Sequence, residues 1–298
     1  MTPSLQLPLL RRDLLGESPL WDASAQALYW VDARGRRVQR WCPQQGGVLQ
    51  HWDAPQDLGS IALTTDANRL LLALADGFAL LDLASGAVTP RAAVQHPKPP
   101  MRLNDGRCDR EGRFVCGSMV LHRRDAEGSL YRLEHDGRVS TLIAGGIAVS
   151  NAICFSPDGR RLYFADSLSG LIRRWDYAVD GSLSNEQVFA DTRSQGSGPD
   201  GATVDADGCL WVALVMAARL ACYAPDGRLL RLLDLPVPYP SCPAFGGPAL
   251  DRLYVTSIRD SGNVLRSDDP AAGALVEISG LGVRGLAEVP YRSEQPAP

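Results

Sequence analysis

The stretch SPDGRRLYFAD at residues 156–166 decides the fold, because its pattern returns along the whole chain. A turn sequence, Ser-Pro-Asp-Gly, is followed by a short apolar run that is typical of a β-strand. Residues 205–213 repeat the pattern as DADGCLWVA, and looser copies surround four other aspartates. The aspartates that mark the six copies are Asp22, Asp66, Asp109, Asp158, Asp207 and Asp251, so one repeat takes 43 to 49 residues.

Each repeat continues with further strand-like runs. Third runs lie at residues 38–41, 129–133, 171–175 and 274–278, and fourth runs at residues 137–142 and 227–232. Four short strands per repeat are typical of a β-propeller blade. The sequence therefore predicts an all-β fold, a six-bladed β-propeller with four-stranded antiparallel blades, as a single domain over residues 1–298. A β-sandwich or an open array of strands fits the even period less well, and no long stretch has a helical period.

The two ends of the chain are expected to meet in one blade. A short apolar run, Leu5–Leu10, precedes the first repeat. We expect it to pair into the sixth blade, which closes the ring and hides the sheet edges.

Composition excludes several classes of function. The net charge is −4, and Lys98 is the only lysine. A nucleic-acid surface would need clustered cations, and neither Schiff-base chemistry nor a phosphate-binding P-loop fits a chain without a suitable lysine. No G-x-S-x-G motif is present, which disfavours a Ser-His-Asp hydrolase.

Cysteine usage and hydropathy favour a cytoplasmic protein. The seven cysteines are scattered and include no C-x-x-C pair, which is typical of neither a disulfide framework nor a zinc-thiolate site. No apolar stretch reaches the length of a membrane span, and no secretory signal is evident at the N-terminus. We expect no membrane partner and no nucleic-acid partner.

Polar residues recur at one phase of the innermost strands. In a propeller, the first strand of each blade lines a central channel. Counting back five to seven residues from four of the marker aspartates gives Glu17, Asn104, Asn151 and Asp200. The counterparts in blades two and six, Leu58–Ser60 and Ala244–Gly247, are apolar or rich in glycine. Four oxygen-bearing side chains at one channel mouth predict a site for a hard cation.

Each of these residues could alone have an ordinary structural role. Asp200 stands in Gly-Pro-Asp-Gly and Asn104 in Asn-Asp-Gly, both of which are common turn sequences. Glu17 could be a solvated turn residue, and Asn151 could tolerate a left-handed backbone. The shared phase favours function over these separate explanations.

Several segments together resemble the senescence-marker-protein/regucalcin/gluconolactonase family of six-bladed propeller lactonases. The segments that carry the resemblance are residues 15–21 (LGESPLW), 102–106 (RLNDG), 150–151 (SN), 165–168 (ADSL), 199–201 (PDG), 245–247 (FGG) and 280–285 (GLGVRG). They span nearly the whole chain. The resemblance implies that Glu17, Asn151 and Asp200 are metal ligands, that Asp200 is also the general base, and that Arg102 and Asn104 hold the substrate.

The predicted function is metal-dependent hydrolysis of a sugar lactone to the aldonic acid, with one divalent cation as cofactor. Calcium, magnesium, manganese, zinc and Fe(II) all remain open as the metal. Two alternatives remain for the activity: a non-catalytic calcium-binding or regulatory propeller, and an esterase or organophosphate hydrolase on the same scaffold. The sequence leaves the sugar and the oligomeric state open.

One stretch departs from the family pattern. The family member regucalcin has a substrate-contacting Glu after the second strand of the third blade, whereas residues 117–123 here read GSMVLHR. His122 could take over a polar role, although a surface histidine is the simpler interpretation.

Overall fold

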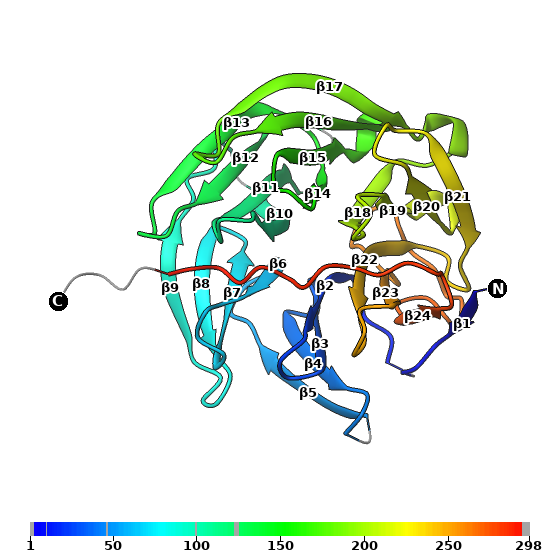
Figure 1. Cartoon of the computed structure of the whole chain (residues 1–298). Helices are drawn as coiled ribbons and strands as arrows, with labels where there is room; N and C mark the ends of the chain where they lie inside the picture. The colour runs from blue at the N-terminus through cyan, green and yellow to red at the C-terminus, as the bar shows by residue number, and fades with distance from the viewer. Residues whose placement is uncertain (1–2, 10, 46, 99, 122–124, 294–298) are drawn as a thin grey trace.

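The computed structural model describes residues 3–9, 11–45, 47–98, 100–121 and 125–293, and within them the chain forms six four-stranded antiparallel sheets. The sheets stand around a central channel as the blades of a propeller (Figure 1). The sequence-based prediction of a six-bladed β-propeller is therefore confirmed. The helices in this part of the chain are three short 3-10 turns, η1 (Ser167–Ser169), η2 (Arg193–Gln195) and η3 (Val215–Ala217). None of them is long and apolar enough to cross a membrane.

The strands of each blade follow one another in sequence from the channel outward. Blade 1 has β2 (Gly16–Asp22), β3 (Ala27–Asp32), β4 (Arg37–Cys42) and β5 (Val48–Asp53); blade 2 has β6 (Leu58–Leu63), β7 (Arg69–Leu74), β8 (Gly77–Asp82) and β9 (Val88–Ala93). Blade 3 has β10 (Met101–Cys108), β11 (Phe114–Val120), β12 (Gly128–Leu133) and β13 (Val139–Ile147); blade 4 has β14 (Ser150–Phe155), β15 (Arg161–Asp166), β16 (Leu171–Tyr177) and β17 (Leu183–Asp191). Blade 5 has β18 (Pro199–Val204), β19 (Leu210–Leu214), β20 (Arg219–Tyr223) and β21 (Leu229–Asp234).

Blade 6 closes the ring with strands from both ends of the chain. It contains β22 (Pro240–Gly246), β23 (Arg252–Ser257), β24 (Val276–Ser279) and, outermost, β1 (Ser4–Gln6). Ser4 lies opposite Ser279 in the β1–β24 ladder. The expected closure is confirmed, although the N-terminal strand ends at Gln6 and starts one residue before the apolar run.

The hydrophobic core lies between neighbouring blades. Buried side chains form six clusters, and each cluster joins the facing surfaces of two adjacent sheets. Between blades 1 and 6, for example, the ring of Tyr254 stacks on Trp21 with centroids 5.9 Å apart and meets Trp41 edge-on. Burial of such large aromatic side chains stabilises each blade against the next.

A C-terminal strap, residues 280–293, crosses the channel after the last blade strand (Figure 1). The Gly285 amide donates to the carbonyl of Leu250 in blade 6, and the Tyr291 amide donates to the carbonyl of Leu63 in blade 2. These partners lie at or beyond the far ends of the inner strands. The strap therefore covers the mouth opposite the one where those strands begin.

Candidate metal and substrate site

The inner strands share an irregularity at the positions where the sequence predicts the site residues. In each blade the pairing between the first and second strands shifts register just after the inner strand begins. The residues at the shift are Glu17, Gly59, Asn104, Asn151, Asp200 and Ser241 for blades 1 to 6. A β-bulge turns a side chain away from the regular alternation, so these bulges aim one residue per blade toward the channel mouth.

Blade 6 differs from the sequence-based expectation. Counting back from Asp251 had placed the equivalent position within Ala244–Gly247, but Pro240 lies opposite Ser257 and the shift follows it. The segment between inner-strand start and marker turn is longer in this blade, so the count was wrong. The equivalent residue is Ser241, whose hydroxyl donates to the carbonyl of Gly16 at 2.5 Å.

Strained backbone accompanies two of the candidate ligands. Ser18, after Glu17, has φ of 49°, and Ala152, after Asn151, has φ of 55°. Non-glycine residues adopt this region at a cost, and they keep it only where surrounding contacts enforce it. The Ser18 hydroxyl accepts from the Ile61 amide at 3.0 Å, which joins blade 1 to blade 2.

A chain of hydrogen bonds holds Asn151 between blades 3 and 5. Asn104 Nδ2 donates to Asn151 Oδ1 at 3.0 Å and to the carbonyl of Ser150 at 2.7 Å. Asn151 Nδ2 donates to the hydroxyl of Ser167, which itself donates to the carbonyl of Pro199, next to Asp200. The amide oxygen of Asn151 is thereby oriented, with a lone pair left for a further partner.

Three carboxylates and one guanidinium meet at this end of the channel. Burial, followed by repulsion from Asp200 and Asp105, raises the pKa of Glu17 well above its ordinary value. Burial and the charge of Asp105 raise the pKa of Asp200 to about 8, and burial also raises the pKa of Asp105. Arg102, itself buried, is a cation that lowers the pKa of both Glu17 and Asp200. The structure thus places all five predicted site residues together.

Asp105 is the residue that sequence reasoning missed. Asn-Asp-Gly at 104–106 looks like a hairpin turn, but these residues lie inside the inner strand β10. In a regular strand, neighbours point to opposite faces, which would have separated Asn104 from Asp105. The register shift between Leu103 and Gly106 removes that alternation. The available signal in the sequence was an acidic residue directly after the candidate Asn104.

The donor set fits a hard divalent cation. Carboxylates that are buried, as Asp200 is, or half-buried, as Glu17 and Asp105 are, and that repel one another gain from an added positive charge. Carboxylate and amide oxygens are the donors that such ions prefer. The proposed ligand set has two acids, Glu17 and Asp200, and one amide, Asn151. A cluster of three His, Cys, Asp or Glu side chains that could hold a metal does not occur in the described part of the chain, so the Asn amide is an essential member of the set.

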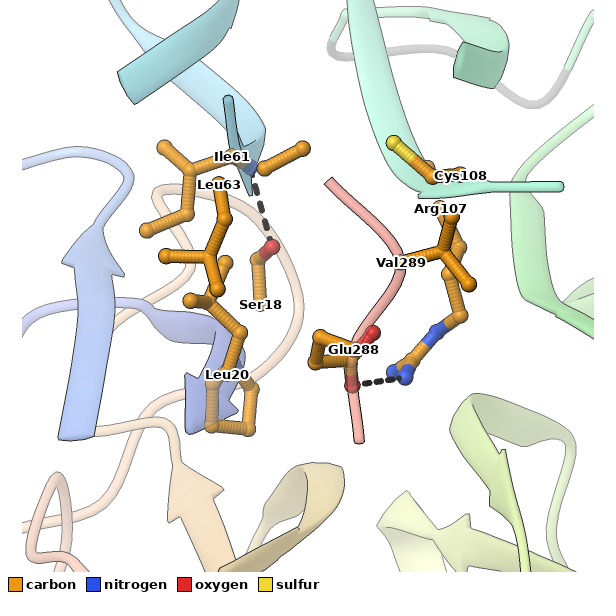
Figure 2. Close-up of a pocket in the computed structure, with 11 residues that line it drawn as sticks. Ser18, Leu20, Ile61, Leu63, Arg107, Cys108, Glu288 and Val289 are labelled. Atoms are coloured by element: carbon orange, nitrogen blue, oxygen red, sulfur yellow. Dashed lines mark hydrogen bonds and ion pairs between the residues drawn. The ribbon is translucent and has the colours of Figure 1, made fainter. Parts of the chain in front are cut away.

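A small cavity lies in the channel below this site. It has a volume of about 20 Å³, enough for roughly one water molecule, and Ser18 and Arg107 are among its lining residues. Figure 2 shows Arg107 paired with Glu288 of the C-terminal strap, and both residues line this cavity. This ion pair ties the strap to the inner strand of blade 3.

His122 lies outside the described residues, so its role stays a prediction. The strand before it is β11, and Val120 at its end is buried.

Comparison with known proteins gives consistent matches. Residues 15–259 match the family model described as the SMP-30/Gluconolactonase/LRE-like region. An L-arabinolactonase from Azospirillum brasilense is 41% identical, covering 92% of this chain and 91% of that protein. A regucalcin from Xenopus laevis is 34% identical over 93% of this chain and 94% of its own length. Among solved structures, a calcium-binding protein, regucalcin, from Agrobacterium tumefaciens superposes with a TM-score of 0.88 at 30% identity, covering 96% of each chain.

Proposed function

The chain belongs to the SMP-30/gluconolactonase/LRE-like family, and from this premise we propose that it is a lactonase that hydrolyses sugar lactones to aldonic acids. One observation carries the proposal: the carboxylates of Glu17 and Asp200 lie close enough at one channel mouth to repel each other, beside the guanidinium of Arg102. Such a site is suited to hold a divalent cation and to move a proton next to it.

We assign the metal-binding role to Glu17, Asn151 and Asp200. Two carboxylates and an amide would supply oxygen ligands of the kind that hard divalent cations prefer. A bound divalent cation supplies Lewis-acid polarisation of the carbonyl and favours the ionised form of the neighbouring carboxylates.

The remaining steps use side chains of this protein. Arg102 and Asn104 hold the ring by hydrogen bonds to its oxygens. Asp200 removes a proton from water as the water oxygen bonds to the carbonyl carbon. The bond from that carbon to the ring oxygen then breaks, the ring oxygen takes up the proton, and the open-chain acid leaves.

The substrate class follows from the relatives and from one missing side chain. A relative is named L-arabinolactonase and another 6-deoxy-6-sulfogluconolactonase, which suggests five- and six-carbon sugar lactones as substrates. Residues 117–121 carry no carboxylate in place of the Glu of regucalcin. A site without that acceptor loses discrimination for one hydroxyl. We propose that both pentono- and hexonolactones are accepted, with L-arabinolactone as the first to test.

We also propose a cytoplasmic location. All seven cysteines are unpaired in the structure, and six of them are buried. Such thiols suit a reducing compartment.

The test is acid release from a panel of sugar lactones, measured before and after chelation. We expect hydrolysis to disappear on prolonged chelation and to return with Ca²⁺, Mn²⁺, Mg²⁺ or Zn²⁺. Full activity in a preparation shown to be metal-free would contradict the metal site. Because relatives include a protein described as calcium-binding, Ca²⁺ titration runs in parallel. Tight Ca²⁺ binding without hydrolysis of any lactone would favour the non-catalytic alternative.

A further inference from the structure

Asp105 is hydrogen-bonded to the backbone of the strand segment that carries Asn151. Its Oδ2 accepts a hydrogen bond from the amide of Ile153 at 2.7 Å, across the boundary between blades 3 and 4. Ile153 lies in the bulge between the paired positions Asn151 and Cys154, so the strand ladder provides no partner for that amide. The carboxylate therefore takes the place of a missing strand contact.

The segment that Asp105 holds contains the strained residue. Ala152 is fully buried with φ of 55°, and it stands between Asn151 and Ile153. A β-branched or alanine residue in this region returns to ordinary backbone angles unless its neighbours are fixed. The hydrogen bond to Ile153 fixes the residue after Ala152, and pairing of Asn151 with Ala165 fixes the residue before it.

Two consecutive residues of β10 thus hold the two sides of Asn151. Asn104 binds its side-chain oxygen and the preceding carbonyl, while Asp105 binds the amide two residues later. We propose that Asp105 is a positioning residue, which sets the direction of Asn151 Oδ1 toward the metal through the Ile153 amide. The inference rests on the proposed metal site. Partners that orient metal ligands commonly change affinity about 10- to 100-fold when removed.

The experiment measures metal affinity by calorimetric titration of metal-free protein with Mn²⁺. We expect Asp105→Ala to weaken binding about 10- to 100-fold. Asp105→Asn keeps an oxygen that can accept from Ile153 and should retain most of the affinity. Equal losses in both variants would mean that the charge alone matters, and this would overturn the proposal.

A double-mutant cycle identifies the route of the effect. If Asp105 acts through Asn151, then Asp105→Ala should cost almost nothing further in an Asn151→Ala background. A full additional loss there would make Asp105 a direct ligand or a charge partner and would overturn the assignment.

Asp109→Asn is the matched control. Asp109 follows the same inner strand and accepts backbone amides of Glu111 and Arg113, but it lies at the strap end of the channel. Folded Asp109→Asn protein should bind Mn²⁺ like wild type. If wild-type protein binds no Mn²⁺, both the metal site and this assignment fail; if wild type binds and Asp105→Ala is unchanged, only the assignment fails.

Discussion

Asp200 has its backbone fixed from both neighbouring blades. The carbonyl of Pro199 accepts from the Ser167 hydroxyl of blade 4 at 2.6 Å. On the other side, a Cβ built on Gly201 would lie 2.4 Å from Cys242 Sγ of blade 6, so the strands pack as closely as glycine permits. A carboxylate held this rigidly is suited to proton transfer, because the donor and acceptor distance is set in advance.

Substitution separates the roles of the two acids that we assign to the metal. Asp200→Asn should remove catalysis even at saturating metal, with a loss on the order of 10²–10⁴ in kcat from the missing base. Glu17→Gln should mainly weaken metal affinity, so excess ion should restore part of its activity. The measurement is kcat as a function of metal concentration for both variants.

The two variants also control for each other, because each replaces a carboxylate by an amide of similar shape. Near-normal kcat for metal-loaded Asp200→Asn would assign the base role to another group. Failure of excess ion to rescue Glu17→Gln would give Glu17 a part in the chemistry itself.

Sequence reasoning identified the positions of the proposed ligands but not the contacts between them. Glu17, Asn151 and Asp200 share a phase that can be counted from the repeat. Asp105 escaped because the strand alternation that normally separates neighbours is suspended at a bulge, and a bulge has no sequence signature of its own here. The Ser167 bridge joins residues of separate blades, which no local pattern reveals.

The inner strand β6 of blade 2 has a glycine at the position where blades 1, 3, 4 and 5 have a candidate site residue. Its residue at the shared phase is Gly59, and a Cβ built there would lie 2.4 Å from the carbonyl oxygen of Asn104 and 2.6 Å from that of Leu103. Both contacts are to backbone, which has little freedom to move. Glycine at this position lets β10 approach β6 and fixes where Asn104 stands.

Gly59→Ala should therefore damage the site without altering any polar residue. The methyl group must push β10 away, which should destabilise the fold by about 1–3 kcal/mol. Displacement of Asn104 should also reduce kcat/KM, about 10- to 100-fold for a shift near 1 Å. Urea unfolding and lactone kinetics measure the two effects.

Gly145→Ala in the outer strand β13 is the control for this variant. Gly145 also faces a cost, because its φ is 67°, but nothing lies within 4 Å of a Cβ built there. We expect a small loss of stability and wild-type kinetics. Unchanged kinetics in Gly59→Ala would show that Asn104 needs no such exact placement.

Strand prediction succeeded because each repeat carries its own turn. The marker aspartates of blades 1 to 4 accept backbone amides of their turns; Asp158, for example, accepts from the Arg160 amide at 3.0 Å. In blade 5 the nearby Asp205 does so instead. Such turns are local, so they can be recognised in the sequence. The strap at residues 280–293 was not predicted, since it has neither alternation nor a repeat and takes its course from distant blades.

The ring closes at a seam between blades 6 and 1 that contains a buried acid. Asp13 accepts from Trp30 Nε1 at 2.7 Å and from Gln39 Nε2 at 2.9 Å in blade 1, and its amide donates to the carbonyl of Gly273 in blade 6. Burial, together with repulsion from Asp32, raises the pKa of Asp13 to about 6, although the two hydrogen bonds lower it.

The stability of this seam should depend on pH. The folded pKa of about 6 lies above the ordinary value of 3.8, so the folded state binds the proton more tightly. This contribution is complete below about pH 4 and is lost as pH rises through 6, at a cost of about 3 kcal/mol by pH 7. Asp13→Asn removes the titrating group.

The measurement is the free energy of unfolding in urea, on metal-free protein, for Asp13→Asn and for wild type. The difference between the two should shift by about 3 kcal/mol in favour of the variant between pH 4 and pH 7. The difference cancels other acids that titrate in both proteins. A constant difference across this range would show that Asp13 keeps an ordinary pKa.

Pairing of Ser4 with Ser279 has a consequence for how the protein is made. On the ribosome, β1 emerges before every other strand of the propeller, and its partner β24 is translated some 270 residues later. Contacts this distant in sequence form slowly, and until they form blade 6 keeps an open edge. A nascent chain that stalls before β24 would already carry every candidate ligand, but its sixth blade would lack β24 and would leave β1 without a partner. Chains that end before β24 should therefore close the ring poorly and be less stable than the full propeller.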